Sequence, residues 1–137
     1  MAEQGAGKIL VADNDEDILV ALECVLEEKG YATTVALSSA ETFRLLSQDS
    51  FDLLVLDDYL SDGDSVQTLT ECRSAGIGLL VVVTYHRFPS CTEAGRLRGL
   101  GVRALVNKRA HSELVEIVDH LLTPRGPGPR FAFAGIT

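Results

Sequence analysis

The sequence predicts an α/β protein with a doubly wound, five-stranded parallel sheet, built from five strand–helix units. Short apolar runs alternate five times with stretches whose apolar residues recur at helical spacing. Strict alternation of this kind is typical of a parallel sheet with helices on both faces, joined by right-handed crossovers. The most apolar run, Ile77 to Val83, is typical of a strand buried on both faces of such a sheet.

The first unit opens with a strand predicted for Lys8–Ala12. Asp13, Asn14 and Asp15 follow it, and Asn14 or Asp15 can cap the next helix. That helix carries apolar residues at helical spacing and is expected to end at Gly30, because glycine commonly terminates helices.

The second and third units follow the same plan. A weaker strand is predicted for Tyr31–Ala36, and the S-x-x-E pattern from Ser38 to Glu41 is a capping box that opens a helix. The third strand, Leu53–Leu56, runs directly into Asp57. An apolar strand that ends in a carboxylate places that group at the sheet edge, where open α/β sheets bind their ligands.

The last two units complete the sheet. The third helix ends near Gly76, the fourth strand ends in Thr84, and a capping box from Ser90 to Glu93 opens the fourth helix. The fifth strand, Val102–Val106, ends in Asn107 and Lys108, and the final helix carries an apolar stripe between Leu114 and Leu122.

The termini differ in character from the domain between them. From Thr123 onward, three prolines and two glycines within seven residues end any helix. We therefore expect an N-terminal extension over residues 1–7, one domain over 8–123 and a C-terminal tail over 124–137. The apolar patch Phe131–Ala134 in the tail is expected to be disordered, with docking onto the domain or a neighbouring sheet edge as the alternative.

Composition limits the partners. The chain has 137 residues, 46% of them hydrophobic, so one packed core is expected. The formal net charge of −8 argues against a direct nucleic-acid surface, which needs clustered Lys and Arg. Negative charge also fits a cation site, although plain solubility explains it equally well.

Cysteines and hydropathy indicate a cytoplasmic protein with no membrane partner. Cys24, Cys72 and Cys91 are odd in number and widely spaced, as expected for reduced thiols. Cys24 and Cys72 are predicted to fill the core from apolar helix faces. The N-terminus has no apolar signal segment, and no apolar run approaches the roughly 20 residues that cross a membrane.

Chemically complementary side chains follow four of the five strands. Because parallel strands point the same way, Asp13, Asn14, Asp57, Thr84 and Lys108 are expected to meet at one sheet edge. Two carboxylates and neighbouring oxygens suit a hard cation such as Mg²⁺. A carboxylate beside that cation can attack a phosphoryl group and carry it covalently, while a hydroxyl and an ammonium hold the phosphoryl oxygens.

Each of these residues also has a plainer interpretation when taken alone. Asp13 could help to cap a helix, Thr84 could satisfy a backbone carbonyl, and Lys108 could be a solvated charge. The acids near Asp57 are expected to have other roles: Asp58 turns away, and Asp62 and Asp64 belong to the loop and the next helix cap. His86, in the loop beside the site, is expected to be solvated.

The chain resembles a response regulator receiver domain, the CheY-like, flavodoxin-like phosphoacceptor module of two-component signalling, from about Lys8 to Leu122. The segments that carry the resemblance, in order and with compatible spacing, are ILVADNDEDI, DLLVLDDYLSDGD, LLVVVT and ALVNK. The resemblance implies these roles: Asp57 as phosphoacceptor; Asp13, Asp57, the Tyr59 backbone carbonyl and, through water, Asn14 as Mg²⁺ ligands; Thr84 as switch hydroxyl; and Lys108 as partner of the phosphoryl group or Asp57.

Several positions depart from the family pattern. Asn14 stands where the family usually has a second acid after the first strand. This change should weaken Mg²⁺ binding rather than abolish it. Leu105 stands where the family usually has an aromatic switch residue. Tyr85 stands where the family usually has a small residue, and its ring could partly cover the pocket. Arg109 replaces the usual proline, so its bond to Lys108 is expected to be either trans, displacing Lys108, or cis at a cost of about 3 kcal/mol.

The resemblance implies a single-domain response regulator, not an enzyme beyond self-catalysed phosphorylation and dephosphorylation. A histidine kinase or phosphotransfer protein would supply the phosphoryl group, and a downstream protein would receive the signal. A homodimer would use the face of the fourth helix, fifth strand and fifth helix. Two alternatives remain: a pseudo-receiver that docks partners without phosphorylation, favoured by Tyr85, Leu105 and Arg109, and a metal-dependent phosphatase, disfavoured by Tyr59.

Overall fold

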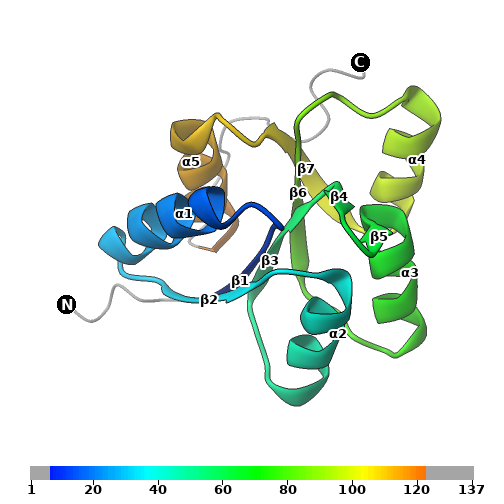
Figure 1. Cartoon of the computed structure of the whole chain (residues 1–137), viewed down its shortest axis with the longest axis horizontal. Coiled ribbons are helices and arrows are strands. Elements are labelled where there is room, and N and C mark those ends of the chain that lie inside the picture. The colour runs from blue at the N-terminus through cyan, green and yellow to red at the C-terminus, as the bar shows by residue number, and fades with distance from the viewer. Residues whose placement is uncertain (1–6, 123–137) are drawn as a thin grey trace.

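Five parallel strands form the central sheet of the computed structural model, which describes residues 7–122 (Figure 1). The strand order is β2-β1-β3-β6-β7. The predicted doubly wound parallel sheet is therefore confirmed, with β3 at its centre. The strands are β1 (Lys8–Ala12), β2 (Ala32–Ala36), β3 (Leu53–Asp57), β6 (Leu80–Tyr85) and β7 (Val102–Asn107).

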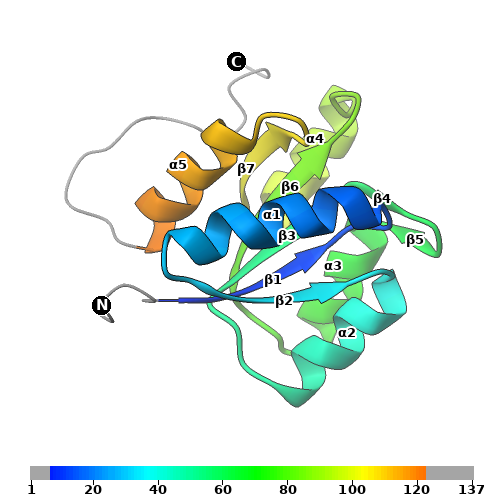
Figure 2. The same ribbon diagram turned by 60° about the vertical axis from the view of Figure 1, so that its left-hand side comes forward.

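Helices cover both faces of the sheet (Figures 1 and 2). One face packs against α1 (Glu16–Glu28) and α5 (His111–Leu122), and the other against α2 (Ser39–Gln48), α3 (Ser65–Ser74) and α4 (Cys91–Gly99). Successive residues of β3 alternate between these two cores. Because both faces are covered, the strand reads as a continuous apolar run rather than an alternating one.

A short antiparallel hairpin follows β3, formed by β4 (Tyr59–Leu60) and β5 (Gly63–Asp64). The Asp62 carboxylate accepts the backbone N–H groups of Ser39 and Ala40, at 2.7 and 3.0 Å, and so joins the hairpin to the start of α2. Asp64 caps α3, as expected. The sequence predicted only a loop here, because two-residue strands are too short for a recognisable alternation.

Some element boundaries differ from the prediction. β6 begins at Leu80 rather than Ile77, because the Ile77 N–H donates to the Cys72 carbonyl and completes the end of α3. β2 begins one residue after Tyr31, whose N–H is likewise used at the end of α1. Of the two proposed caps for α1, Asp15 fills the role by accepting the N–H of Asp17.

The two cysteines predicted to fill the core behave differently. Cys72 is buried beneath α3, as expected, whereas Cys24 is exposed, so that prediction is wrong. The buried residues of α1 are Leu19, Leu22 and Leu26. Cys24 lies two residues from Leu22, about 200° around the helix, and therefore on the opposite side.

A polar cluster joins α1, β2 and α5. The buried Tyr31 hydroxyl donates to the Asp119 carboxylate of α5, and the Lys29 ammonium at the end of α1 lies 3.1 Å from the same carboxylate. Burial, together with the hydrogen bond and charge of Asp119, raises the pKa of Tyr31. The final helix is thus fixed to the sheet by polar as well as apolar contacts.

Within residues 7–122, no helix combines the length and apolar character that crossing a membrane requires. The expectations for the N-terminal extension, the tail 124–137 and its patch Phe131–Ala134 concern residues 1–6 and 123–137, which lie outside the described part of the chain.

Candidate functional site

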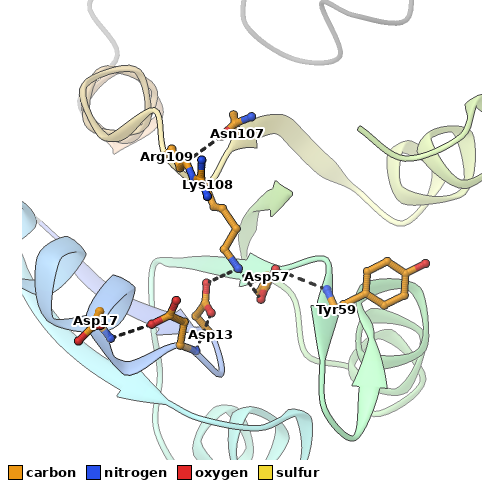
Figure 3. Close-up of polar contacts among 8 residues, drawn as sticks. Asp13, Asp17, Asp57, Tyr59, Asn107, Lys108 and Arg109 are labelled. Carbon is orange, nitrogen blue, oxygen red and sulfur yellow. Dashed lines mark hydrogen bonds and ion pairs between the residues drawn. The ribbon is translucent and has the colours of Figure 1, made fainter. Parts of the chain in front are cut away.

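Three of the predicted site residues meet at the carboxyl end of the sheet (Figure 3). Lys108 Nζ donates to Asp57 Oδ2 at 3.1 Å and lies 3.3 Å from Asp13 Oδ2. Both carboxylates are buried, with 1% of Asp13 and 4% of Asp57 exposed. Because the three residues come from the ends of β1, β3 and β7, parallel topology brings together groups that are far apart in the sequence.

The backbone holds the strand ends in register. Asp57 is paired with Thr84 of β6, which is 2% exposed. The Asp58 N–H donates to the Thr84 carbonyl at 2.8 Å, and the Lys108 N–H donates to the Tyr85 carbonyl at 2.9 Å. These bonds continue the hydrogen-bonding pattern beyond β3 and β7, so Asp57, Thr84 and Lys108 lie on neighbouring segments.

The turn after β7 directs Lys108 to the site although Arg109 follows it. The described residues contain no cis peptide bond, so the Lys108–Arg109 bond is trans. Asn107 closes the turn by accepting the Arg109 N–H with its side chain and the Ala110 N–H with its carbonyl, each at 2.9 Å. Of the two expectations for this bond, trans is therefore confirmed, and Lys108 still reaches Asp57.

Burial and charge shift the ionisation of this group. The pKa of Asp57 is raised to about 6, first by burial and then by the charge of Asp13, while Lys108 opposes the shift. Burial works to lower the pKa of Lys108, but its hydrogen bond and charge contacts with Asp57, together with the charge of Asp13, outweigh burial and raise it. Two carboxylates and one ammonium leave the site with one excess negative charge at neutral pH.

The donor set fits a hard divalent cation. Asp13 and Asp57 are buried, converge on the same ammonium and carry uncompensated negative charge. Across residues 7–122, no group of three or more His, Cys, Asp or Glu side chains is placed to bind a metal. A Mg²⁺ site here therefore depends on these two carboxylates, supplemented by carbonyl or amide oxygens and water.

The other two expected metal ligands lie next to the carboxylates. The backbone N–H of Tyr59 points toward Asp57 Oδ1 at 3.5 Å, so the start of β4 lies beside the carboxylate (Figure 3). The exposed Asn14 contributes to the pocket over Asp57. Both residues therefore border the site formed by Asp13 and Asp57.

An open pocket gives access to Asp57. Sequence reasoning noted His86 beside the site but missed Arg87, whose only signal is its position two residues after the end of β6. The lining residues are Asn14, Asp57, Asp58, Tyr59, His86, Arg87 and Lys108.

Tyr85 does not cover this pocket. Its ring packs edge-on against Phe88, with centroids 5.2 Å apart and planes at 85°, beside the core shared with α3 and α4. Leu105, at the family's aromatic position, is buried in the same core. The expectation that Tyr85 could partly cover the pocket is therefore wrong, and the exposed ring that lines it is that of Tyr59, which is 62% exposed.

Asp58 turns away from Lys108, as expected, but it is buried. Its Oδ1 accepts the Ser65 hydroxyl at 2.6 Å, at the start of α3. Burial raises its pKa, with the hydrogen bond from Ser65 opposing the shift. Asp58 therefore joins the end of β3 to α3 and does not take part in the cluster around Lys108.

Comparison with known proteins identifies one family. The family model described as "Response regulator receiver domain" matches residues 9–119. The transcriptional regulatory protein PrrA of Mycobacterium tuberculosis is 32% identical over 122 residues, which is 87% of this chain and 51% of PrrA. The chain spans about half or less of the curated relatives that it matches.

Solved structures share the architecture. The receiver domain of the Francisella response regulator 1452 aligns with a TM-score of 0.77 and 26% identity, covering 85% of this chain and 96% of that one. The response regulator TrrA of Thermotoga maritima, solved in complex with Mg²⁺ and BeF, aligns with a TM-score of 0.72 and 23% identity, covering 83% and 97%.

Proposed function

The chain belongs to the response regulator receiver family, and we propose that Asp57 is its phosphoacceptor. One observation carries the proposal: Asp57 and Asp13 are buried together at the end of the sheet and share the Lys108 ammonium. Receiver domains are regulatory phosphoacceptors, so chemistry at this site means accepting and losing a phosphoryl group rather than repeated turnover of a substrate.

In the proposed reaction, a carboxylate oxygen of Asp57 attacks the phosphorus of a phosphohistidine on a kinase or phosphotransfer protein. A phosphorus–oxygen bond forms, the phosphorus–nitrogen bond breaks, and the imidazole leaves with the electron pair and takes up a proton. The open pocket over Asp57 supports this, because a side chain of a second protein can reach the carboxylate through it.

The neighbouring residues have distinct proposed roles. The Lys108 ammonium, already bonded to Asp57, would hold a phosphoryl oxygen as charge moves onto the acceptor. Thr84, paired with Asp57 across β3 and β6, would be the switch hydroxyl. Asp13, Asp57 and the Tyr59 carbonyl would hold Mg²⁺, with Asn14 through water. Bound Mg²⁺ supplies charge neutralisation for the phosphoryl oxygens.

We further propose that the chain works in the cytoplasm and passes its signal to a protein partner. The face formed by α4, β7 and α5 is the proposed contact surface, including for a homodimer. Several relatives are named transcriptional regulators and are longer than this chain. The acidic charge of the chain supports output through protein rather than through direct nucleic-acid contact.

Intact-mass spectrometry after incubation with acetyl phosphate and Mg²⁺ tests the acceptor. The wild type should gain about 80 Da, the mass of one added HPO₃. Asp57→Asn should gain nothing. Asp52→Asn is the matched control, because it removes the same charge at the opposite end of β3 and should retain the adduct.

The competing function is a pseudo-receiver that docks partners without phosphorylation. Leu105 and Arg109 favour it, because they replace two residues of the usual signalling apparatus. A wild-type protein that gains no mass, or an adduct that survives in Asp57→Asn, would overturn the phosphoacceptor proposal and leave the docking module.

A further inference from the structure

A second pocket adjoins the one over Asp57, between the start of α1 and the turn from β7 to α5. The two pockets share His86 and Lys108, so they meet at those side chains. The second pocket is lined by Asp15, Ile18, His86, Lys108, Arg109 and His111. It therefore continues the opening over Asp57 toward α5.

The Arg109 guanidinium lines this pocket and, within the described part of the chain, makes no polar contact that stabilises the fold. The Lys108 ammonium is engaged by Asp13 and Asp57, but among residues 7–122 the Arg109 side chain has neither a hydrogen bond nor an ion pair. The acidic residue that lines this pocket is Asp15, whose Oδ1 accepts the Asp17 N–H at the start of α1. An unpaired guanidinium is notable in a chain with a formal net charge of −8.

The opposite side of the Asp57 pocket has the reverse charge. Three acidic side chains, those of Glu93, Asp58 and more weakly Asp64, act electrostatically on the exposed Tyr59. Negative charge is therefore concentrated between the hairpin and α4. An anionic leaving group that departs from a phosphorus atom at Asp57 would be repelled on that side and attracted toward Arg109.

We propose that the second pocket is a subsite for the leaving carboxylate of an acyl phosphate. The inference rests on the proposed function of Asp57. An Asp57 oxygen bonds to phosphorus, the bond from phosphorus to the acyl oxygen breaks, and the electron pair leaves on the carboxylate. No proton transfer and no redox partner are needed.

The geometry of the transfer places the charge where Arg109 can act. In an in-line displacement the leaving oxygen lies on the side of phosphorus opposite the attacking oxygen. Asp57 is almost fully buried where it lines the first pocket, so a leaving oxygen beyond the phosphorus would lie within that pocket, which meets the second pocket at His86 and Lys108. Negative charge develops on the leaving oxygen in the transition state, and a preplaced guanidinium stabilises it there.

Two phosphodonors with different leaving groups test the subsite. Acetyl phosphate releases a carboxylate, whereas phosphoramidate releases ammonia and develops no negative charge there. Arg109→Gln should lower the rate of Asp57 phosphorylation by acetyl phosphate about three- to tenfold, and change the phosphoramidate rate less than about twofold. Arg109→Lys, which keeps the charge, should restore most of the loss.

Arg103→Gln is the matched control. Arg103 is exposed on β7 but lines neither of the two pockets, so both rates should stay at the wild-type level. An equal loss with both donors, or no loss with either, would overturn the subsite while leaving Asp57 as the acceptor. A wild-type protein that reacts with neither donor would overturn the phosphoacceptor proposal itself and the subsite with it.

Discussion

Asp13 and Asp57 share a single ammonium, with Lys108 Nζ 3.3 Å from one carboxylate and 3.1 Å from the other. Burial first and the charge of Asp13 second raise the pKa of Asp57, and the hydrogen bond and charge of the single Lys108 ammonium do not offset both. The site therefore favours the binding of a cation. Without a bound cation, its excess negative charge lowers the stability of the folded protein.

We predict that Asp57→Asn raises the free energy of unfolding at pH 7.5 by about 1 to 2 kcal/mol. Folding raises the pKa of Asp57 from its ordinary value of 3.8 to about 6, through burial first and the charge of Asp13 second. Between these values the unfolded chain gives up this proton more readily than the folded one, so the folded state loses stability as the pH rises through this window.

Urea unfolding without Mg²⁺, at pH 7.5 and at pH 4, measures this effect. The gain from Asp57→Asn should be largest at pH 7.5 and should nearly disappear at pH 4, where the carboxyl group is largely protonated in the folded state. A variant that is less stable than the wild type at pH 7.5 would show that Asp57 is not destabilising.

The charges around Asp57 should also be measurable one at a time. In the metal-free wild type, the carboxyl carbon of Asp57 should titrate by NMR with a pKa of about 6. Asp13→Asn should lower this pKa, because it removes a negative neighbour. Lys108→Met should raise it, because it removes the hydrogen bond and the positive charge. A shift of the opposite sign in either variant would contradict this assignment of causes.

Strand ends could be predicted from the sequence because each buried strand stops at a polar residue. Asp13, Asp57 and Lys108 were found in this way, and parallel topology then requires them to meet. Arg87 could not be found, because the loop after β6 has no periodicity that indicates where its side chains lie. The hairpin after β3 was missed for the same reason.

The alternation of side chains along β6 already predicts the direction of the Tyr85 ring. Side chains of a strand alternate between faces, so Tyr85 shares a face with Val81 and Val83, which pack toward α3 and α4. This alternation already points the ring away from Asp57. The turn that keeps Lys108 in place is different: it depends on the hydrogen bonds of Asn107, which the sequence pattern did not reveal.

Tyr85→Ala should therefore destabilise the fold without opening the site. We expect a loss of about 2 kcal/mol in the free energy of unfolding, because a half-buried ring and its contact with Phe88 disappear. The rate of phosphorylation by phosphoramidate should change less than about twofold.

Tyr59→Ala is the matched control for that prediction. This ring is 62% exposed and lines the pocket, so its removal should hardly affect stability but should change the phosphorylation rate. Faster phosphorylation in Tyr85→Ala, with no change in Tyr59→Ala, would mean that Tyr85 shields the acceptor after all.

Tyr31→Phe should lower the free energy of unfolding by about 1 to 2 kcal/mol. The variant keeps the ring but removes the hydroxyl that donates to Asp119, leaving a partly buried carboxylate with Lys29 as its ion-pair partner. Urea unfolding measures the loss, and Tyr59→Phe controls for removal of an exposed hydroxyl. Equal stability of Tyr31→Phe and the wild type would mean that the Tyr31 hydroxyl does not help to hold α5.

Borohydride reduction followed by peptide sequencing in a mass spectrometer tests the identity of the acceptor most directly. Borohydride reduces an aspartyl phosphate to homoserine and so marks the modified residue permanently, which distinguishes Asp57 from the adjacent Asp58. After treatment with acetyl phosphate and Mg²⁺, homoserine should replace Asp57 alone. Homoserine at Asp58 or Asp13, or no reduced residue in a sample that has gained mass, would contradict the central claim.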